Sequence, residues 1–148
     1  MSRALFNSQF EMELRSLFLL SVCETIPVSV ERIVSLDFIA CYGADFGLPV
    51  SNLHGQNRTK FGEISNRRKL VQGAIKALVT KGMVTVHVDH GYYFFISDMG
   101  QNYIQKFESD YAKEYLIAAD EAVKKYNSNS DEELLGVIQE YSLQSLRG

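Results

Sequence analysis

The chain has 148 residues, of which 46% are hydrophobic and two are proline, so it can form one well-packed domain without long disordered segments. No apolar run approaches the roughly 20 residues that cross a bilayer, and the first eight residues lack the apolar centre of a secretion signal, so we expect a cytoplasmic protein. The net charge of −3 argues against a dedicated duplex-binding protein, which is usually basic overall.

A capping box predicts where the first helix begins. Ser8 and Glu11 have the spacing at which the serine hydroxyl accepts from a backbone N–H three residues on and the carboxylate reaches back. Pro27 ends the helical segment, because the residue before a proline avoids the helical region. The predicted core-facing stripe contains Phe10, Leu14, Leu17 and Phe18.

A second helix is predicted over residues 30–42, with Ser29 as its N-cap and Gly43 ending it in the left-handed conformation. This helix is apolar apart from Asp37, and a lone buried carboxylate would be costly. Asp37 therefore points to solvent or meets a cation, and Arg15 and Arg67 are the candidates. We favour a structural ion pair, because no second carboxylate or histidine stands at a spacing useful for catalysis.

Residues 47–62 have the composition of a loop, and a third helix is predicted from Glu63 to Lys81. Its apolar face is formed by Ile64, Val71, Ala74, Ile75 and Leu78. From His54 to His90 the sequence has seven basic residues and two acidic ones, so a basic segment lies within an acidic chain. The basic residues predicted to contact a partner or DNA are Arg58, Lys60, Arg67, Arg68, Lys69 and Lys76.

Three interpretations of this basic cluster stay open. It is a solvated helix face, a contact for nucleic-acid phosphates whose strength depends on salt, or a surface that docks onto an acidic protein. Part of it is expected to be structural, in a polar cluster of Arg15, Asp37, Glu63 and Arg67.

The hydrophobic periodicity changes from about 3.6 to 2 residues after Lys81. Val84, Val86 and Val88 alternate with polar residues, residues 89–91 supply a turn, and an aromatic run returns as a second strand. A helix that leads straight into such a hairpin is typical of a winged helix, a module that usually binds DNA or serves as an adaptor.

Helices are also predicted over residues 97–107, from residue 108 onward and from residue 131 onward. Asp131, Glu132 and Glu133 favour the positive N-terminal end of the last one. We divide the chain into a winged-helix domain, residues 1–108, and a helical C-terminal extension, residues 109–148, that packs on this domain or on a partner.

The sequence does not indicate an enzyme. Cys23 and Cys41 lie in apolar surroundings and are expected to be buried thiols, and the three histidines are too scattered for a zinc site. No glycine motif that binds phosphate and no nucleophile with a neighbouring base is recognisable. We therefore expect no catalytic residue, metal, cofactor or small-molecule substrate.

Four segments resemble the small winged-helix middle components of bacterial ABC-ATPase three-component systems. They are Phe6–Asn7–Ser8 with Glu11, Leu14–Arg15 and Leu17; Arg32–Phe38 leading to Gly43–Asp45; Leu53–His54 with Glu63, Arg67–Arg68 and Gly73; and Leu78–Val84 leading to Gly91–Tyr93. Two positions depart from the pattern: Gly55 replaces an expected proline, and Lys60 replaces an expected arginine and lacks its bidentate fork.

The small subunit of the Lamassu anti-phage and anti-plasmid defence systems is similar. The resemblance implies a non-catalytic adaptor that sits on the heads of an SMC- or Rad50-like ATPase and couples DNA sensing to the release of an effector, often a nuclease. It implies no membrane partner, and it leaves open whether the chain itself touches DNA.

The expected fold is mainly α (α+β): a winged helix with one β-hairpin, an extra N-terminal helix and a helical C-terminal extension. The expected function is that of the adaptor. The alternative is a winged-helix transcription regulator that acts as a homodimer on a palindrome. A small immunity or antitoxin-like binder is a third possibility, supported only by size and acidity.

Overall fold

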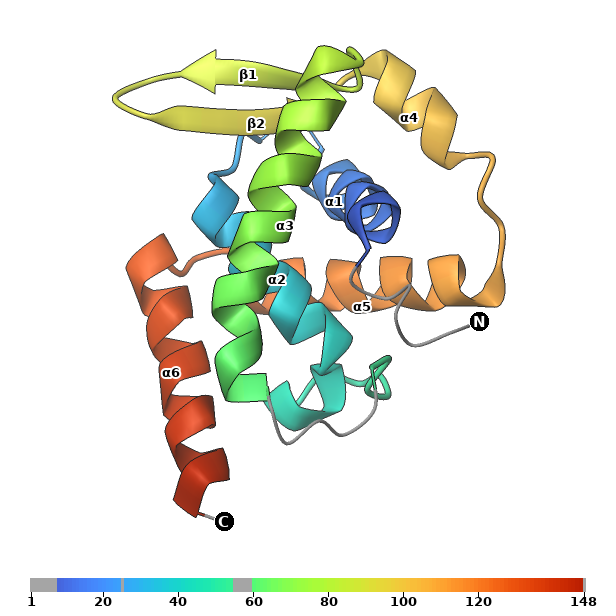
Figure 1. Ribbon diagram of the computed structural model, residues 1–148. Helices are drawn as coiled ribbons and strands as arrows, with labels where there is room; N and C mark the ends of the chain where they lie inside the picture. The colour runs from blue at the N-terminus through green and yellow to red at the C-terminus, as the bar shows by residue number, and fades with distance from the viewer. Residues whose placement is uncertain (1–7, 25, 55–59, 148) are drawn as a thin grey trace.

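The computed structural model describes residues 8–24, 26–54 and 60–147, with the backbone alone at residues 60–63 and 145–147. The predicted mainly α fold with one antiparallel hairpin is confirmed (Figure 1). The helices are α1 (Gln9–Cys23), α2 (Val30–Cys41), the 3₁₀ helix η2 (Gly43–Phe46), α3 (Lys60–Thr80), α4 (Asp98–Ile104), α5 (Asp110–Tyr126) and α6 (Asp131–Arg147). The strands are β1 (Val84–Val88) and β2 (Tyr92–Ile96).

Serine caps fix the start of five helices. In each, the hydroxyl oxygen accepts from the backbone N–H three residues on and so satisfies an amide that a helix start leaves unpaired. The caps are Ser8 of α1, Ser29 of α2, Ser97 of α4, Ser109 of α5 and Ser130 of α6, with distances of 3.0 to 3.2 Å. The predicted caps at Ser8 and Ser29 are confirmed.

The left-handed glycine lies four residues later than predicted. Gly43 begins η2, and the glycine of this segment with a positive φ, 75°, is Gly47. At Gly43 a Cβ would lie only 2.4 Å from Cγ2 of Val50, so this glycine allows the following turn to pack closely against the end of α2. The prediction that Gly43 is a left-handed C-cap is therefore wrong.

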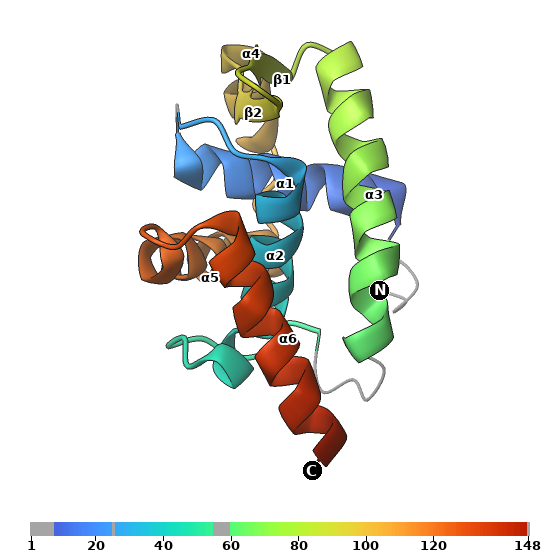
Figure 2. The same cartoon turned by 90° about the vertical axis from the view of Figure 1, so that its left-hand side faces the viewer.

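Helices α1 and α2 form the centre of the molecule. Helix α3 covers one side of α2 and α5 covers the other, as the two perpendicular views show (Figures 1 and 2). The face of α3 that was expected to be apolar is buried except at Ile64, which is partly buried. Helix α5 contributes buried Tyr115 and a row of small residues. That row is Ala112, Ala118, Ala119 and Ala122. The small side chains let α5 lie close to both central helices.

The hairpin pairs Val84 with Ile96, Val86 with Phe94 and Val88 with Tyr92. The base of the hairpin is buried, whereas its far end projects past α3 (Figure 1). At this far end Val88 is 67% exposed and Tyr92 is 70% exposed.

A further strand-like contact lies on the other edge of β2. The N–H of Val28 donates to the carbonyl of Phe94 at 2.9 Å, and the N–H of Phe94 donates back at 2.8 Å. This bridge joins the segment before α2 to the hairpin, and the sequence analysis did not predict it.

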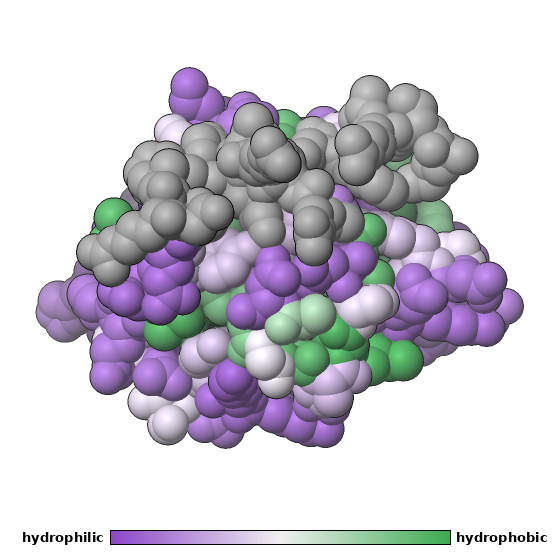
Figure 3. Space-filling view, turned by 90° about the horizontal axis from the view of Figure 1, so that it is seen from below, coloured by the Kyte–Doolittle hydropathy of each residue, from purple (hydrophilic) through white to green (hydrophobic). Residues whose placement is uncertain are grey.

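Helix α6 is fastened to the start of α2. The Arg32 guanidinium donates to the carbonyls of Tyr126 and Asn129 at 2.8 and 2.7 Å and pairs with Asp131 at 3.2 Å. The Ser29 hydroxyl also donates to Asp131. Residues 109–147 thus contact the body of the chain along α5 and α6, whereas the domain boundary at residue 108 stays a prediction. On the face opposite the hairpin, hydrophobic residues gather among hydrophilic ones (Figure 3).

Candidate functional site

Asp37 is the centre of a buried polar cluster that joins four helices. The Arg15 guanidinium of α1 binds it through two hydrogen bonds, from Nε and Nη2, each of 3.0 Å. Nη1 of Arg67 on α3 donates to Oδ2, and the Tyr115 hydroxyl of α5 donates to Oδ1 at 2.6 Å. These four residues are at most 1% exposed. The Asp37 carboxylate therefore pairs with both Arg15 and Arg67, the two candidate cations named from the sequence.

The charges of this cluster hold Asp37 ionised. Burial alone would raise the pKa of the Asp37 carboxyl, but the two guanidinium groups and the hydrogen bonds from Arg15 and Tyr115 outweigh it. The resulting pKa lies well below the usual value. Asp37 is therefore a structural counter-ion in this structure and is not placed to exchange protons near neutral pH.

The buried thiols are unreactive. Cys23 and Cys41 are both free and buried, as predicted, and burial raises the pKa of each to about 11. Cys41 lies beside the polar cluster and accepts a hydrogen bond from Nη1 of Arg67 at 3.6 Å. Within the described ranges, no three histidine, cysteine or acidic side chains gather in a way that could hold a metal ion.

His54 lies at the edge of the same cluster. Its Nε2 is 3.0 Å from the Tyr111 hydroxyl, and its ring stacks on Tyr111 and meets Tyr42 edge-on. Burial, together with the positive charges of Arg15 and Arg67, lowers the pKa of His54 to about 3. The side chain is therefore neutral in the folded protein at any physiological pH.

This lowered pKa predicts an acid-sensitive step in stability. Between pH 6.5 and about 3 the unfolded chain protonates His54 and the folded chain does not, so the free energy of unfolding falls as the pH falls. The contribution is at most about 1.4 kcal/mol per pH unit. Urea unfolding at several pH values measures how steeply the free energy of unfolding changes with pH. We expect His54→Gln to make this dependence less steep. The matched substitution His90→Gln, at an exposed histidine, should leave the slope as it is, and equal slopes for all three proteins would contradict the assignment.

The predicted basic residues do not share one environment. Arg67 was predicted both as a residue that contacts a partner or DNA and as a member of the structural polar cluster. Its side chain is buried and bound to Asp37, so it is not exposed for contact with a partner. Arg68 is half-buried and binds Glu31 through two hydrogen bonds of 2.7 and 3.1 Å. Lys69 and Lys76 are exposed on α3. Arg58 lies outside the described residues, as do the side chains of Lys60 and Glu63.

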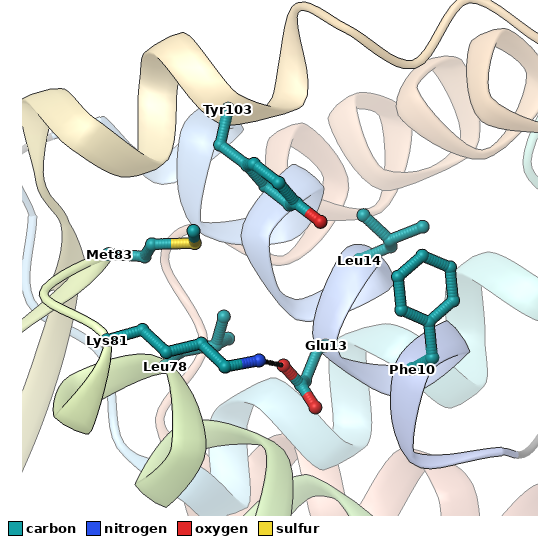
Figure 4. A pocket seen from close by; sticks show the side chains of 7 residues that line it. All are labelled: Phe10, Glu13, Leu14, Leu78, Lys81, Met83 and Tyr103. Carbon is teal, nitrogen blue, oxygen red and sulfur yellow. Dashed lines mark hydrogen bonds and ion pairs between the residues drawn. The ribbon is translucent and has the colours of Figure 1, made fainter.

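Lys81, which follows the last residue of α3, also forms an ion pair. Its Nζ donates to Oε1 of Glu13 on α1 at 2.8 Å, across a small hollow that Met83 and Tyr103 also line (Figure 4). The hollow measures about 40 Å³, enough for water but not for a larger ligand. The exposed positive charge of the described part of α3 is thereby concentrated at Lys69 and Lys76.

Periodicity contained a signal for the burial of Arg67. The residue lies three positions after Ile64 and four before Val71, on the same helical stripe as the buried Ala74 and Leu78. An arginine within an apolar stripe predicts a buried partner, and Asp37 is that partner.

Over residues 5–148 the chain matches the family model described as ABC-three component (ABC-3C) system Middle Component 2. It belongs to this family. No curated protein and no solved structure matches the chain.

As a Middle Component 2 protein, the chain is part of an ABC system of several components, so it has partner components. A middle component needs surfaces for these partners. In this one the cluster around Asp37 is buried, whereas Lys69 and Lys76 of α3 and the end of the hairpin are exposed at the surface. No helix in the described part of this middle component is long and apolar enough to cross a membrane.

Proposed function

We propose that this chain is a non-catalytic adaptor, which connects an SMC- or Rad50-like ATPase to an effector nuclease in a defence complex of the Lamassu kind. Membership of the middle-component family carries the proposal, because it implies partners within an ABC system. The polar cluster supports a structural role for the buried charges, since each oxygen of Asp37 is occupied by an arginine or a tyrosine.

We further propose that residues 8–96 form a winged helix. The chain order supports it: α1, the bridging segment at Val28, α2, α3 and then the two strands β1 and β2. The outer face of α3 and the hairpin are the parts with which such a module contacts DNA or protein.

Two exposed surfaces are suited to the partners. Lys69 and Lys76 lie seven residues apart on α3, so both project from the same side of the helix and offer positive charge to an acidic surface. The hairpin end offers an apolar patch of Val86, Val88 and Tyr92, which are 37 to 70% exposed. Exposed apolar side chains that cluster in this way are typical of protein contacts.

The adaptor proposal is tested by co-purification with the ABC ATPase of the same three-component system. We expect the double substitution Lys69→Glu and Lys76→Glu to reduce the recovered ATPase at least about tenfold, because two attractive charges become repulsive. These positions are preferred to Arg68, because Arg68→Glu would also place a negative charge beside Glu31. Lys106→Glu with Lys113→Glu, an equal change of charge at exposed positions outside α3, should leave the recovery unaltered.

The same preparation separates the adaptor from a transcription regulator. A regulator would elute as a dimer without the ATPase and would shift a DNA fragment with an affinity that falls steeply with salt. An adaptor should bind DNA weakly alone and co-purify with the ATPase. Unchanged ATPase recovery by the Lys69 and Lys76 double variant would remove the proposed contact.

A further inference from the structure

The outer edge of β1 is open to a further strand. The hairpin is a two-stranded sheet, so β2 lies on one side of β1 and no described strand lies on the other. In an antiparallel pair, successive residues direct their N–H and C=O groups alternately toward the neighbouring strand and away from it. The hydrogen bonds around the hairpin therefore reveal which residues of β1 point outward.

Two observations fix this alternation. Phe94 of β2 exchanges both of its backbone hydrogen bonds with Val28, so the backbone groups of its cross-strand neighbour Val86 face away from β2. Asp89, three positions after Val86, has the opposite direction, because its N–H donates inward to the carbonyl of Gly91 at 3.0 Å. The even-numbered residues of β1 thus direct their backbone groups to the outer edge.

The far half of this edge is accessible. Val84 is buried, whereas Val86 and Val88 are exposed on the part of the hairpin that projects past α3 (Figure 1). Within the described ranges, no hydrogen bond joins the outward backbone groups of Val86 and Val88 to another residue. Edge strands are usually guarded by lysine, proline or a bulge, and β1 has none of these.

The pattern of unpaired groups fits an extended backbone. An N–H and a C=O recur at every second residue, about 7 Å apart, which is the repeat of a neighbouring β-strand. The side chains of Val86, Val88 and Tyr92 lie on one face of the hairpin. An added strand would therefore place apolar side chains beside them at alternate positions.

The charge of α3 indicates what lies beyond the paired residues. The start of β1 contacts α3, and Lys76 is exposed one turn before the end of that helix. A segment that continues along the edge past Val84 comes beside this turn, where acidic side chains would meet Lys76.

From this edge we infer that an extended segment of a partner component adds to the hairpin as a third strand beside β1. The segment is uncharged where it pairs with β1 and acidic where it continues toward α3. The inference rests on the proposed adaptor role, which it refines by naming main-chain pairing as the contact.

Amide exchange at single-residue resolution tests the third strand, with the other components of the system added in turn to the intact chain. Alone, Thr85 and His87, which pair with β2, should exchange slowly, and Val86 and Val88 rapidly. A bound component should slow exchange at Val86 and Val88 at least about tenfold. Protection that appears in the chain alone and grows with its concentration would assign the edge to a second copy and overturn the inference.

Substitutions at the edge separate the backbone from the side chains. Val86→Pro removes an outward N–H and should reduce recovery of the component at least about tenfold, whereas Val86→Thr keeps the backbone and should preserve recovery. If Val86→Pro fails to fold, Val88→Lys, which adds the charge of a guarded edge, takes its place. Unaltered recovery by a folded edge variant would refute the third strand.

The outcomes also distinguish this inference from the adaptor proposal. A component that binds without protecting the amides of Val86 and Val88 would remove the third strand and leave the adaptor role intact. If no component of the system binds the chain, both the adaptor role and the third strand are refuted.

Discussion

Asp37→Ala is expected to lower the free energy of unfolding by about 3–5 kcal/mol, the usual effect of removing one partner from a buried ion pair. The substitution leaves the guanidinium groups of Arg15 and Arg67 buried near each other without their counter-ion, and Tyr115 without its acceptor. Urea unfolding followed by circular dichroism measures the loss, and native gel filtration shows whether the variant stays folded.

Two comparisons separate the buried charge from a general effect of losing an aspartate. Asp120→Ala, which breaks an exposed ion pair with Lys124 on α5, should change stability little. Replacing the whole buried group by apolar residues, with Arg15→Met, Asp37→Leu and Arg67→Met together, should recover part of the loss. A cost for Asp37→Ala no greater than that for Asp120→Ala would show that the cluster does not stabilise the fold.

Gly100→Ala should destabilise the protein by about 1–3 kcal/mol, because the first turn of α4 has no room for a methyl group. A Cβ at Gly100 would lie 2.4 Å from the carbonyl oxygen of Met83 and 2.8 Å from Cγ1 of Ile96. The Met83 carbonyl cannot retreat easily, since it accepts a hydrogen bond of 3.0 Å from the Ser97 N–H. Thermal unfolding monitored by circular dichroism measures the effect.

The same substitution at Gly136 should act in the opposite direction. Gly136 lies in α6, and a Cβ there would meet nothing within 4 Å. Alanine favours the helix by up to about 1 kcal/mol relative to glycine, so Gly136→Ala should raise the melting temperature. If Gly100→Ala also raised the melting temperature, helix propensity, and not the contact with Met83, would govern the change at Gly100.

Much of the secondary structure was predictable, because local signals specify it. Serine caps and apolar stripes placed α1, α2 and α4 to within a few residues, and alternation with a turn placed the hairpin. The bridge between Val28 and Phe94 was not predictable, since it pairs residues that are distant in sequence. The misplaced left-handed glycine has a similar cause, because Gly43 is fixed by the packing of Val50 and not by the helix end.

The site was predictable only in part. A lone carboxylate in an apolar helix predicted that Asp37 needs a cation, but only the folded chain brings both Arg15 and Arg67 to it. The division of the basic residues into paired and exposed ones likewise depends on tertiary contacts, such as that of Arg68 with Glu31.

The order in which α1, α2, α3 and α5 are synthesised determines when each partner of Asp37 becomes available. Arg15 precedes the aspartate by 22 residues, so the first two helices can neutralise it soon after they leave the ribosome. Tyr115 follows it by 78 residues, and until then one flank of the central helix is uncovered. The nascent protein therefore exposes an apolar surface while these 78 residues are synthesised, a period in which chaperones or an early-bound partner would protect it from aggregation.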